Sequence, residues 1–212
     1  MAANNPSAAT GEFYRRITVS ALDIETGKLH FFDQNTTSYD DFYQATFAST
    51  CIPGAFPPHI WEIDGQTHYF ADGYVIGNVD PERAIQQCME LVDDPSKITL
   101  DVLMLGNMKE FKHEDTESID DNASFANFMR ARDIRYNYSN SNSIASAMRA
   151  YPEVNWRYIL QQDDANTGIN EIKFNGDFTW PLQENGRQVA QEALKWPEGL
   201  SAAMYRNWID SA

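Results

Sequence analysis

The sequence predicts a protein of the α/β class, in which helices pack on a sheet that contains parallel strands. The stretch Ile98–Leu105 is apolar apart from Thr99 and Asp101, as in a strand covered on both faces of a parallel sheet. A helix pattern precedes this stretch and further strand patterns lie on either side, an alternation typical of the class. The 212 residues, 42% hydrophobic, are enough for a sizeable core in one domain or two small ones.

The first third of the chain predicts two hairpins with a helix between them. Hydrophobic residues alternate over Arg16–Ile24, a turn follows, and Leu29–Phe32 is a second extended stretch, which together predict a hairpin. A helix is expected over Ser38–Ala48, because the Ser38 hydroxyl can accept a hydrogen bond from a free amide of the first turn. The dipeptide Asp64-Gly65, between two short strand patterns, predicts the turn of a second hairpin.

The remainder of the chain alternates helix and strand patterns. Asp80 and Pro81 form a favourable helix start, and Asp93-Asp94-Pro95 ends this helix before the apolar strand. Residues 108–121 are acidic and predict a surface loop, whereas residues 136–143 fit no pattern. The other expected elements are a helix near 125–132, strands at 154–160 and 169–174, and helices at 189–194 and 200–208.

Charge and composition exclude several classes of function. The chain has 31 acidic and 16 basic residues, and a net charge of -15 repels phosphate backbones, so we expect no nucleic-acid partner. No apolar run approaches the roughly 20 residues of a membrane-spanning helix, and the first ten residues do not resemble a signal peptide. Cys51 and Cys88 provide no disulfide framework, which makes a reducing compartment, by default the cytoplasm, the expectation.

Two segments together carry the most informative pattern. Ala45–Pro58 is a helix end of small residues followed by a turn of Pro and Phe, and Tyr69–Asn78 places Asp72-Gly73 at the end of a strand. In this order and at this spacing, with Pro81 shortly afterwards, the two segments resemble the patatin-like phospholipases. The resemblance covers the chain from Ile17 to Asn107.

This resemblance implies a three-layer α/β/α sandwich related in layout to the α/β hydrolases. Residues 16–212 would be the C-terminal part of that domain, after a flexible N-terminal segment at 1–15. It also implies hydrolysis of lipid acyl esters by a Ser–Asp dyad, with Asp72 as the base. A carboxylate can take the proton of a serine hydroxyl when partial burial raises its proton affinity. Gly73 can adopt a positive φ without a Cβ penalty, which allows the turn to aim Asp72 into a pocket.

The nucleophile of this family is the serine of a Gly-x-Ser-x-Gly turn, which follows a Gly-rich oxyanion loop. No serine in this sequence has glycine at both flanking positions, and Tyr74 stands where the family has a small residue. The leading hypothesis is the C-terminal part of a patatin-like lipid acyl hydrolase, inactive alone because its nucleophile lies upstream of Met1. Two alternatives stay open: a non-catalytic patatin-like protein that binds lipid or a partner, and an unrelated α/β binding domain.

Other candidate nucleophiles and ligands are less favourable. Ser49 matches a family position that is not the nucleophile, and Cys51 is interpreted as a small buried hydrophobic residue. A Cys–His pair would require His59 or His68 beside Cys51. The four histidines have no metal-ligand spacing, and His113 lies in the acidic run, so no metal site and no cofactor are expected.

The expected partners are lipid acyl esters or phospholipids, with peripheral contact at a membrane surface. Arg130, Arg132, Arg135 and Arg149 could touch anionic head groups, although a charged helix face is the preferred interpretation. A domain without its first half would expose sheet edges and apolar helix faces. We therefore expect the chain alone to oligomerise or aggregate.

Overall fold

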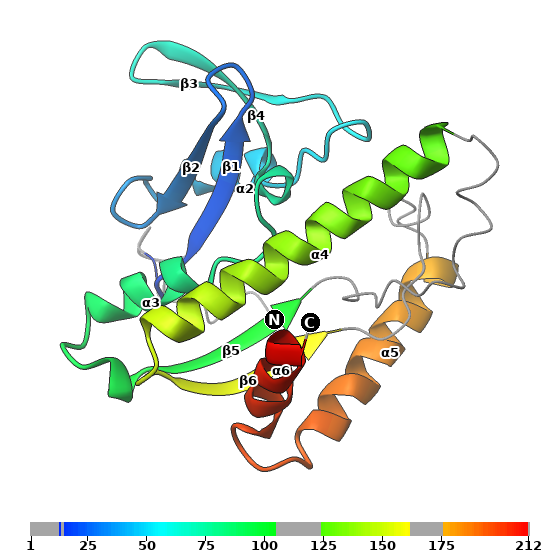
Figure 1. Ribbon diagram of the computed structural model, residues 1–212. Helices are drawn as coiled ribbons and strands as arrows, with labels where there is room; N and C mark the ends of the chain where they lie inside the picture. The colour runs from blue at the N-terminus through cyan, green and yellow to red at the C-terminus, as the bar shows by residue number, and fades with distance from the viewer. Residues whose placement is uncertain (1–12, 14, 105–123, 162–175, 212) are drawn as a thin grey trace. The chain divides into compact units, whose positions relative to one another are not determined.

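The computed structural model describes residues 13, 15–104, 124–161 and 176–211 (Figure 1). These residues form a mixed α/β structure with one four-stranded antiparallel sheet and one two-stranded parallel sheet, as the sequence predicted at this coarse level. The chain divides into two compact units, Met1–Ile76 and Gly77–Ala212, and each is described by itself. The acidic loop expected at 108–121 and the strand expected at 169–174 lie outside the described residues.

The first unit is built on the antiparallel sheet, with strand order β2-β1-β4-β3. β1 (Thr18–Asp23) pairs with β2 (Lys28–Asp33), and β3 (His59–Ile63) pairs with β4 (Gln66–Asp72), which confirms both predicted hairpins. β1 also pairs with β4 and so joins the two hairpins. In the second turn Asp64 has φ 52° and Gly65 has φ 77°, the conformation that the favoured two-residue hairpin turn requires.

Helix α2 (Phe42–Ala48) covers one face of this sheet, and it begins four residues later than predicted. The Ser38 hydroxyl accepts a hydrogen bond from the Asp41 amide at 3.1 Å and donates one to the Asp41 carboxylate at 2.6 Å. The Ser38 hydroxyl thus accepts from an amide as predicted, but the residues between Ser38 and Asp41 form a separate turn and not the first turn of α2. The core between helix and sheet consists of the buried residues Ala21, Phe32, Ala45, Ala48 and Phe70.

The second unit begins with the predicted helix and strand. Helix α3 (Pro81–Met89) follows Asp80, whose carboxylate accepts a hydrogen bond from the Arg83 amide at 3.0 Å. This geometry confirms the expected helix start. A short 3₁₀ turn, η2 (Pro95–Lys97), then leads into β5 (Thr99–Met104).

Strand β5 pairs in parallel with β6 (Asn155–Gln161), which confirms the parallel pairing predicted for the apolar stretch. The expectation that this strand is covered on both faces is wrong. Burial alternates along β5: Val102 and Met104 are buried, whereas Leu103 between them is 73% exposed. An apolar run therefore did not distinguish a strand covered on both faces from one covered on one face.

Helices α4 (Ser124–Ala150), α5 (Gly176–Ala193) and α6 (Leu200–Ser211) complete the described part of the second unit. Residues 136–143, which the sequence pattern left unassigned, are helical within α4, and the Ser141 hydroxyl donates to the Asn137 carbonyl. α5 and α6 pack against β6, and α3 packs against β5 and α4 (Figure 1). Among the described helices, none has the length and apolar composition needed to cross a membrane.

Candidate functional site

Asp72 is the last residue of β4, at the point where the strand passes into the 3₁₀ turn η1 (Gly73–Val75). Its amide donates to the carbonyl of Cys51 at 2.9 Å, so the loop that follows α2 fixes the end of the strand. Its carboxylate accepts a hydrogen bond from the Tyr74 amide at 3.0 Å. Because side chains alternate along a strand, Asp72 shares the α2-covered face of the sheet with Phe70.

Gly73 is required here for a different reason from the one expected. It is not among the residues with positive φ, so the predicted left-handed backbone at this position is wrong. Gly73 is buried against β1, and a Cβ added to it would lie 2.4 Å from the Ser20 hydroxyl and 2.9 Å from the Ser20 carbonyl oxygen. Glycine therefore allows the two backbones to approach closely, which sets the position of the carboxylate beside it.

The electrostatic environment of Asp72 favours its protonated form. Burial raises the pKa of the half-buried carboxyl, and the hydrogen bond from the Tyr74 amide offsets part of this rise. A carboxylate with a raised pKa binds a proton more readily, which is the property that a general base needs.

Cys51 and Ser49 lie in the segment that follows α2. The Cys51 thiol donates to the Phe47 carbonyl at 3.2 Å. Burial raises the pKa of this thiol, and the nearby charge of Asp72 raises it further. A thiol held protonated in this way is a poor nucleophile. Ser49 is the C-terminal cap of α2.

Neither histidine considered as a partner for Cys51 has its ring directed to the thiol. The ring of His59 forms a hydrogen bond with the side-chain oxygen of Gln44 at 2.8 Å, and it stacks on Phe47. The ring of His68 bonds instead to Asp23, at 3.1 Å between Nδ1 and Oδ2. The structure therefore gives no support to a Cys–His pair at Cys51.

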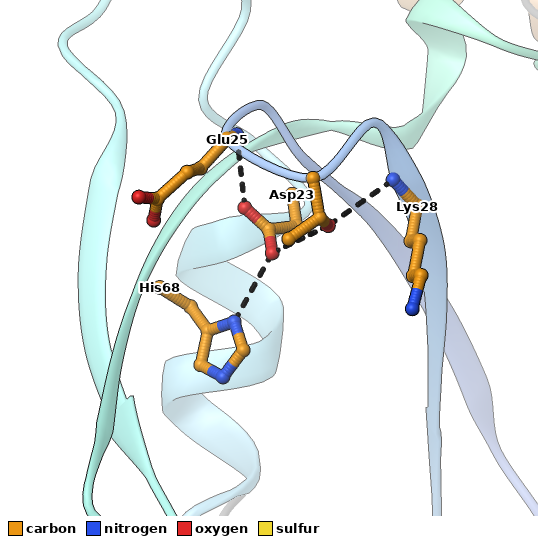
Figure 2. Close-up of polar contacts among 5 residues, drawn as sticks. Asp23, Glu25, Lys28 and His68 are labelled. Carbon is orange, nitrogen blue, oxygen red and sulfur yellow. Dashed lines mark hydrogen bonds and ion pairs between the residues drawn. The ribbon is translucent and has the colours of Figure 1, made fainter.

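The same sheet brings together three residues that the sequence pattern had not connected: Asp23 from β1, His30 from β2 and His68 from β4. One potential ligand atom of each lies within 4.8 Å of the others. Figure 2 shows the carboxylate of Asp23 between the backbone of Glu25 and the ring of His68. The sequence analysis expected no metal site because the histidines lack a metal-ligand spacing along the chain. The fold nevertheless places two of them beside Asp23.

Strand register is the signal that could have identified this cluster. Asp23 pairs with Phe70 on β4, and His30 pairs with Ala21 on β1. Side chains two residues apart on a strand share a face, so Asp23, His30 and His68 fall on one face next to one another. The pairing of β1 with β4 brings together Asp23 and His68, which are 45 positions apart in the chain. The spacing of residues along one sequence does not reveal this pairing. His113 lies outside the described residues.

No protein-family model matches this chain, and no curated protein sequence gives a significant match. The likeness to patatin-like phospholipases therefore stays a proposal that rests on the residues of the site.

Proposed function

We propose that this chain carries the general base of a patatin-like lipid acyl hydrolase, with Asp72 as the acidic member of a Ser–Asp dyad. The nucleophilic serine and the oxyanion donors would be supplied by polypeptide outside this sequence. Together the parts would form a three-layer α/β/α sandwich that cleaves acyl esters of lipids or phospholipids. No metal ion or cofactor takes part in this chemistry.

The observation that carries the proposal is the placement of a half-buried carboxylate at a strand end, beside a glycine packed too closely for a larger residue. Asp72 is held by the hydrogen bond from its amide to the Cys51 carbonyl and by the one that its carboxylate accepts from the Tyr74 amide. Its position is therefore set by backbone groups rather than by flexible side chains. Gly73 packs directly against Ser20 of the neighbouring strand. Such rigid placement is what a general base requires, since proton transfer depends on hydrogen-bond reach.

The raised pKa of Asp72, together with its place at the strand end, supports this chemical role. A serine hydroxyl becomes a strong nucleophile only when a neighbouring base removes its proton. The carboxylate would accept this proton as the serine attacks the ester carbonyl, and would return it to the alcohol that leaves. The Tyr74 amide would keep one carboxylate oxygen in place and leave the other to accept the proton.

The test compares two aspartates that precede a glycine in the same unit. The protein is purified from its source cells through a C-terminal tag, which retains any polypeptide that precedes this sequence. Hydrolysis of a short-chain aryl ester and of phosphatidylcholine is measured, together with serine labelling by a fluorophosphonate probe. We expect Asp72→Asn to reduce hydrolysis by about 10²–10⁴-fold, the range for loss of a general base.

Asp64→Asn is the matched control, because Asp64 also precedes a glycine but lies in a hairpin turn and has φ 52°, which asparagine tolerates. We expect this variant to keep full activity. Equal activity in the Asp72→Asn variant and the parent would contradict the proposal. So would the absence of any serine labelled by the probe.

A second candidate function is a patatin-like protein that binds lipid or a partner without catalysis. It is favoured by the absence of a Gly-x-Ser-x-Gly turn from this sequence and by Tyr74 after Asp72-Gly73. It predicts sedimentation with phosphatidylcholine or anionic vesicles in a protein that the probe does not label. The same purified material therefore distinguishes the two functions.

A further inference from the structure

We infer that Asp23, His30 and His68 form a binding site for a divalent metal ion of the zinc class. The three residues come from neighbouring strands of one sheet, and their potential ligand atoms lie within 4.8 Å of one another. Two imidazole nitrogens and one carboxylate oxygen are a donor set that suits Zn²⁺. Three protein ligands leave a fourth position of the tetrahedron for a water molecule.

The carboxylate at the centre of this cluster is held in place before any ion binds. Asp23 has no exposed surface, and its Oδ1 accepts a hydrogen bond from the Glu25 amide at 3.1 Å. Its Oδ2 accepts from the Thr26 hydroxyl at 2.8 Å. Partners of this kind orient a metal ligand and increase its affinity for the ion.

His30 has the most unusual environment of the three residues. Its half-buried ring lies 5.3 Å from the ring of Phe70 and 5.7 Å from that of His68, measured between centroids. No hydrogen bond joins the His30 ring to any residue that the structure describes. The ring is only partly buried, so water can reach its nitrogens, and a bound cation would take the place of that water at one of them.

The distances are close to those that Zn²⁺ needs. With metal–ligand bonds of about 2.0–2.1 Å, two ligand atoms of a tetrahedral site lie roughly 3.3 Å apart. Asp23 Oδ2 and His68 Nδ1 are 3.1 Å apart, and this pair therefore already has nearly the required separation. No two of the potential ligand atoms are more than 4.8 Å apart. An inward shift of the His30 ring by about 1.5 Å would bring its nitrogen to the separation that a tetrahedral zinc site requires.

Such an ion would join β2, β1 and β4 at the end of the sheet that carries the β1–β2 turn. This position is separate from Asp72, which is four residues beyond His68 on β4, or about 13 Å along the strand. The inference therefore does not depend on the proposed hydrolase function.

The test measures Zn²⁺ binding to the full chain by calorimetry, and Co²⁺ binding by its visible absorption. We expect one binding site. The His30→Gln variant should lower the affinity for Zn²⁺ by more than roughly 10–100-fold, the loss typical when a residue that only hydrogen-bonds to a metal ligand is removed. Thr26→Val removes such a hydrogen bond, so it should weaken binding by about 10–100-fold. His59→Gln is the matched control, because His59 lies in the same unit outside the cluster, and binding should be unchanged.

Nitrogen NMR of the histidine rings identifies the ligands directly, since Cys51 and Cys88 are free thiols that also bind zinc. On saturation with Zn²⁺ we expect His68 Nδ1 to lose its proton and the His30 resonances to shift. A proton that stays on His68 Nδ1 would show that the Asp23–His68 pair is only a hydrogen bond, and would overturn the inference. Zinc affinity unchanged by His30→Gln would also overturn it.

Discussion

The close contact between Gly73 and Ser20 predicts that Gly73→Ala destabilises the first unit. The new Cβ would lie 2.4 Å from the Ser20 hydroxyl oxygen, 2.9 Å from the Ser20 carbonyl oxygen and 3.1 Å from the carbonyl carbon. The hydroxyl can rotate away, but the carbonyl group belongs to β1 and moves only if the strand moves. Overpacking of this kind costs about 1–3 kcal/mol. The equilibrium constant for opening of this part of the first unit should therefore increase about 5–150-fold, since each 1.4 kcal/mol is a factor of ten.

Hydrogen exchange read by mass spectrometry suits this prediction, because it resolves the two units of the chain separately. The Asp72 amide, bonded to the Cys51 carbonyl, and the Ile76 amide, bonded to the Gly73 carbonyl, should exchange faster in the variant. Gly186→Ala in α5 is the matched control, because nothing lies within 4 Å of its new Cβ. We expect it to stabilise α5 by up to about 1 kcal/mol.

The double variant Ser20→Ala/Gly73→Ala separates the side-chain contact from the backbone contact. It removes the 2.4 Å contact with the hydroxyl but keeps the 2.9 Å contact with the carbonyl oxygen. We therefore expect only partial recovery of the protection against exchange. Unchanged exchange in Gly73→Ala, or complete recovery in the double variant, would refute the steric argument.

Two further substitutions test the electrostatics of the site and the start of α3. Because burial raises the pKa of Asp72, its contribution to stability is complete below the ordinary aspartate pKa and is lost as the pH rises through the raised value. The Asp72→Asn variant keeps an oxygen that accepts a hydrogen bond from the Tyr74 amide but carries no charge. Its free energy of unfolding in urea should therefore equal that of the parent near pH 3 and exceed it at about pH 8. A difference that stays constant with pH would contradict this. Asp80→Ala removes the cap that accepts the Arg83 amide, which should cost about 1 kcal/mol in urea unfolding, whereas exposed Asp93→Ala should change little.

Local patterns predicted the elements of this protein well where a few neighbouring residues decide the structure. The turn at Asp64-Gly65 and the helix start at Asp80-Pro81 depend only on preferences of those residues for certain backbone angles and hydrogen bonds. The predicted start of α2 was wrong because the hydrogen bond from the Asp41 amide to Ser38 closes a separate turn here, and the same bond occurs at a helix start. Residues 136–143 fitted no pattern because helix α4 has polar side chains within its middle turns.

The candidate sites show the limit of such patterns more clearly. The position of Asp72 at a strand end followed from its own segment, but the reason for Gly73 did not, because the close approach involves Ser20 on β1, far earlier in the chain. The grouping of Asp23, His30 and His68 depends in the same way on how β1 pairs with β4. Long-range register is decided by packing of the whole sheet rather than by the residues at each position.

The hydrogen bond from the Asp72 amide to the Cys51 carbonyl also fixes the start of the neighbouring loop and leaves its exposed tip outside that contact. The Phe56 amide closes its own turn on the Ile52 carbonyl at 3.0 Å, so the residues from Pro53 to Gly54 project from an already closed base. Gly54 has φ 87° and is exposed, and no atom lies within 4 Å of the place that a Cβ would take there. Insertions at this tip are therefore expected to leave the position of the Asp72 carboxylate unchanged, whereas replacement of Gly54 would strain its left-handed backbone.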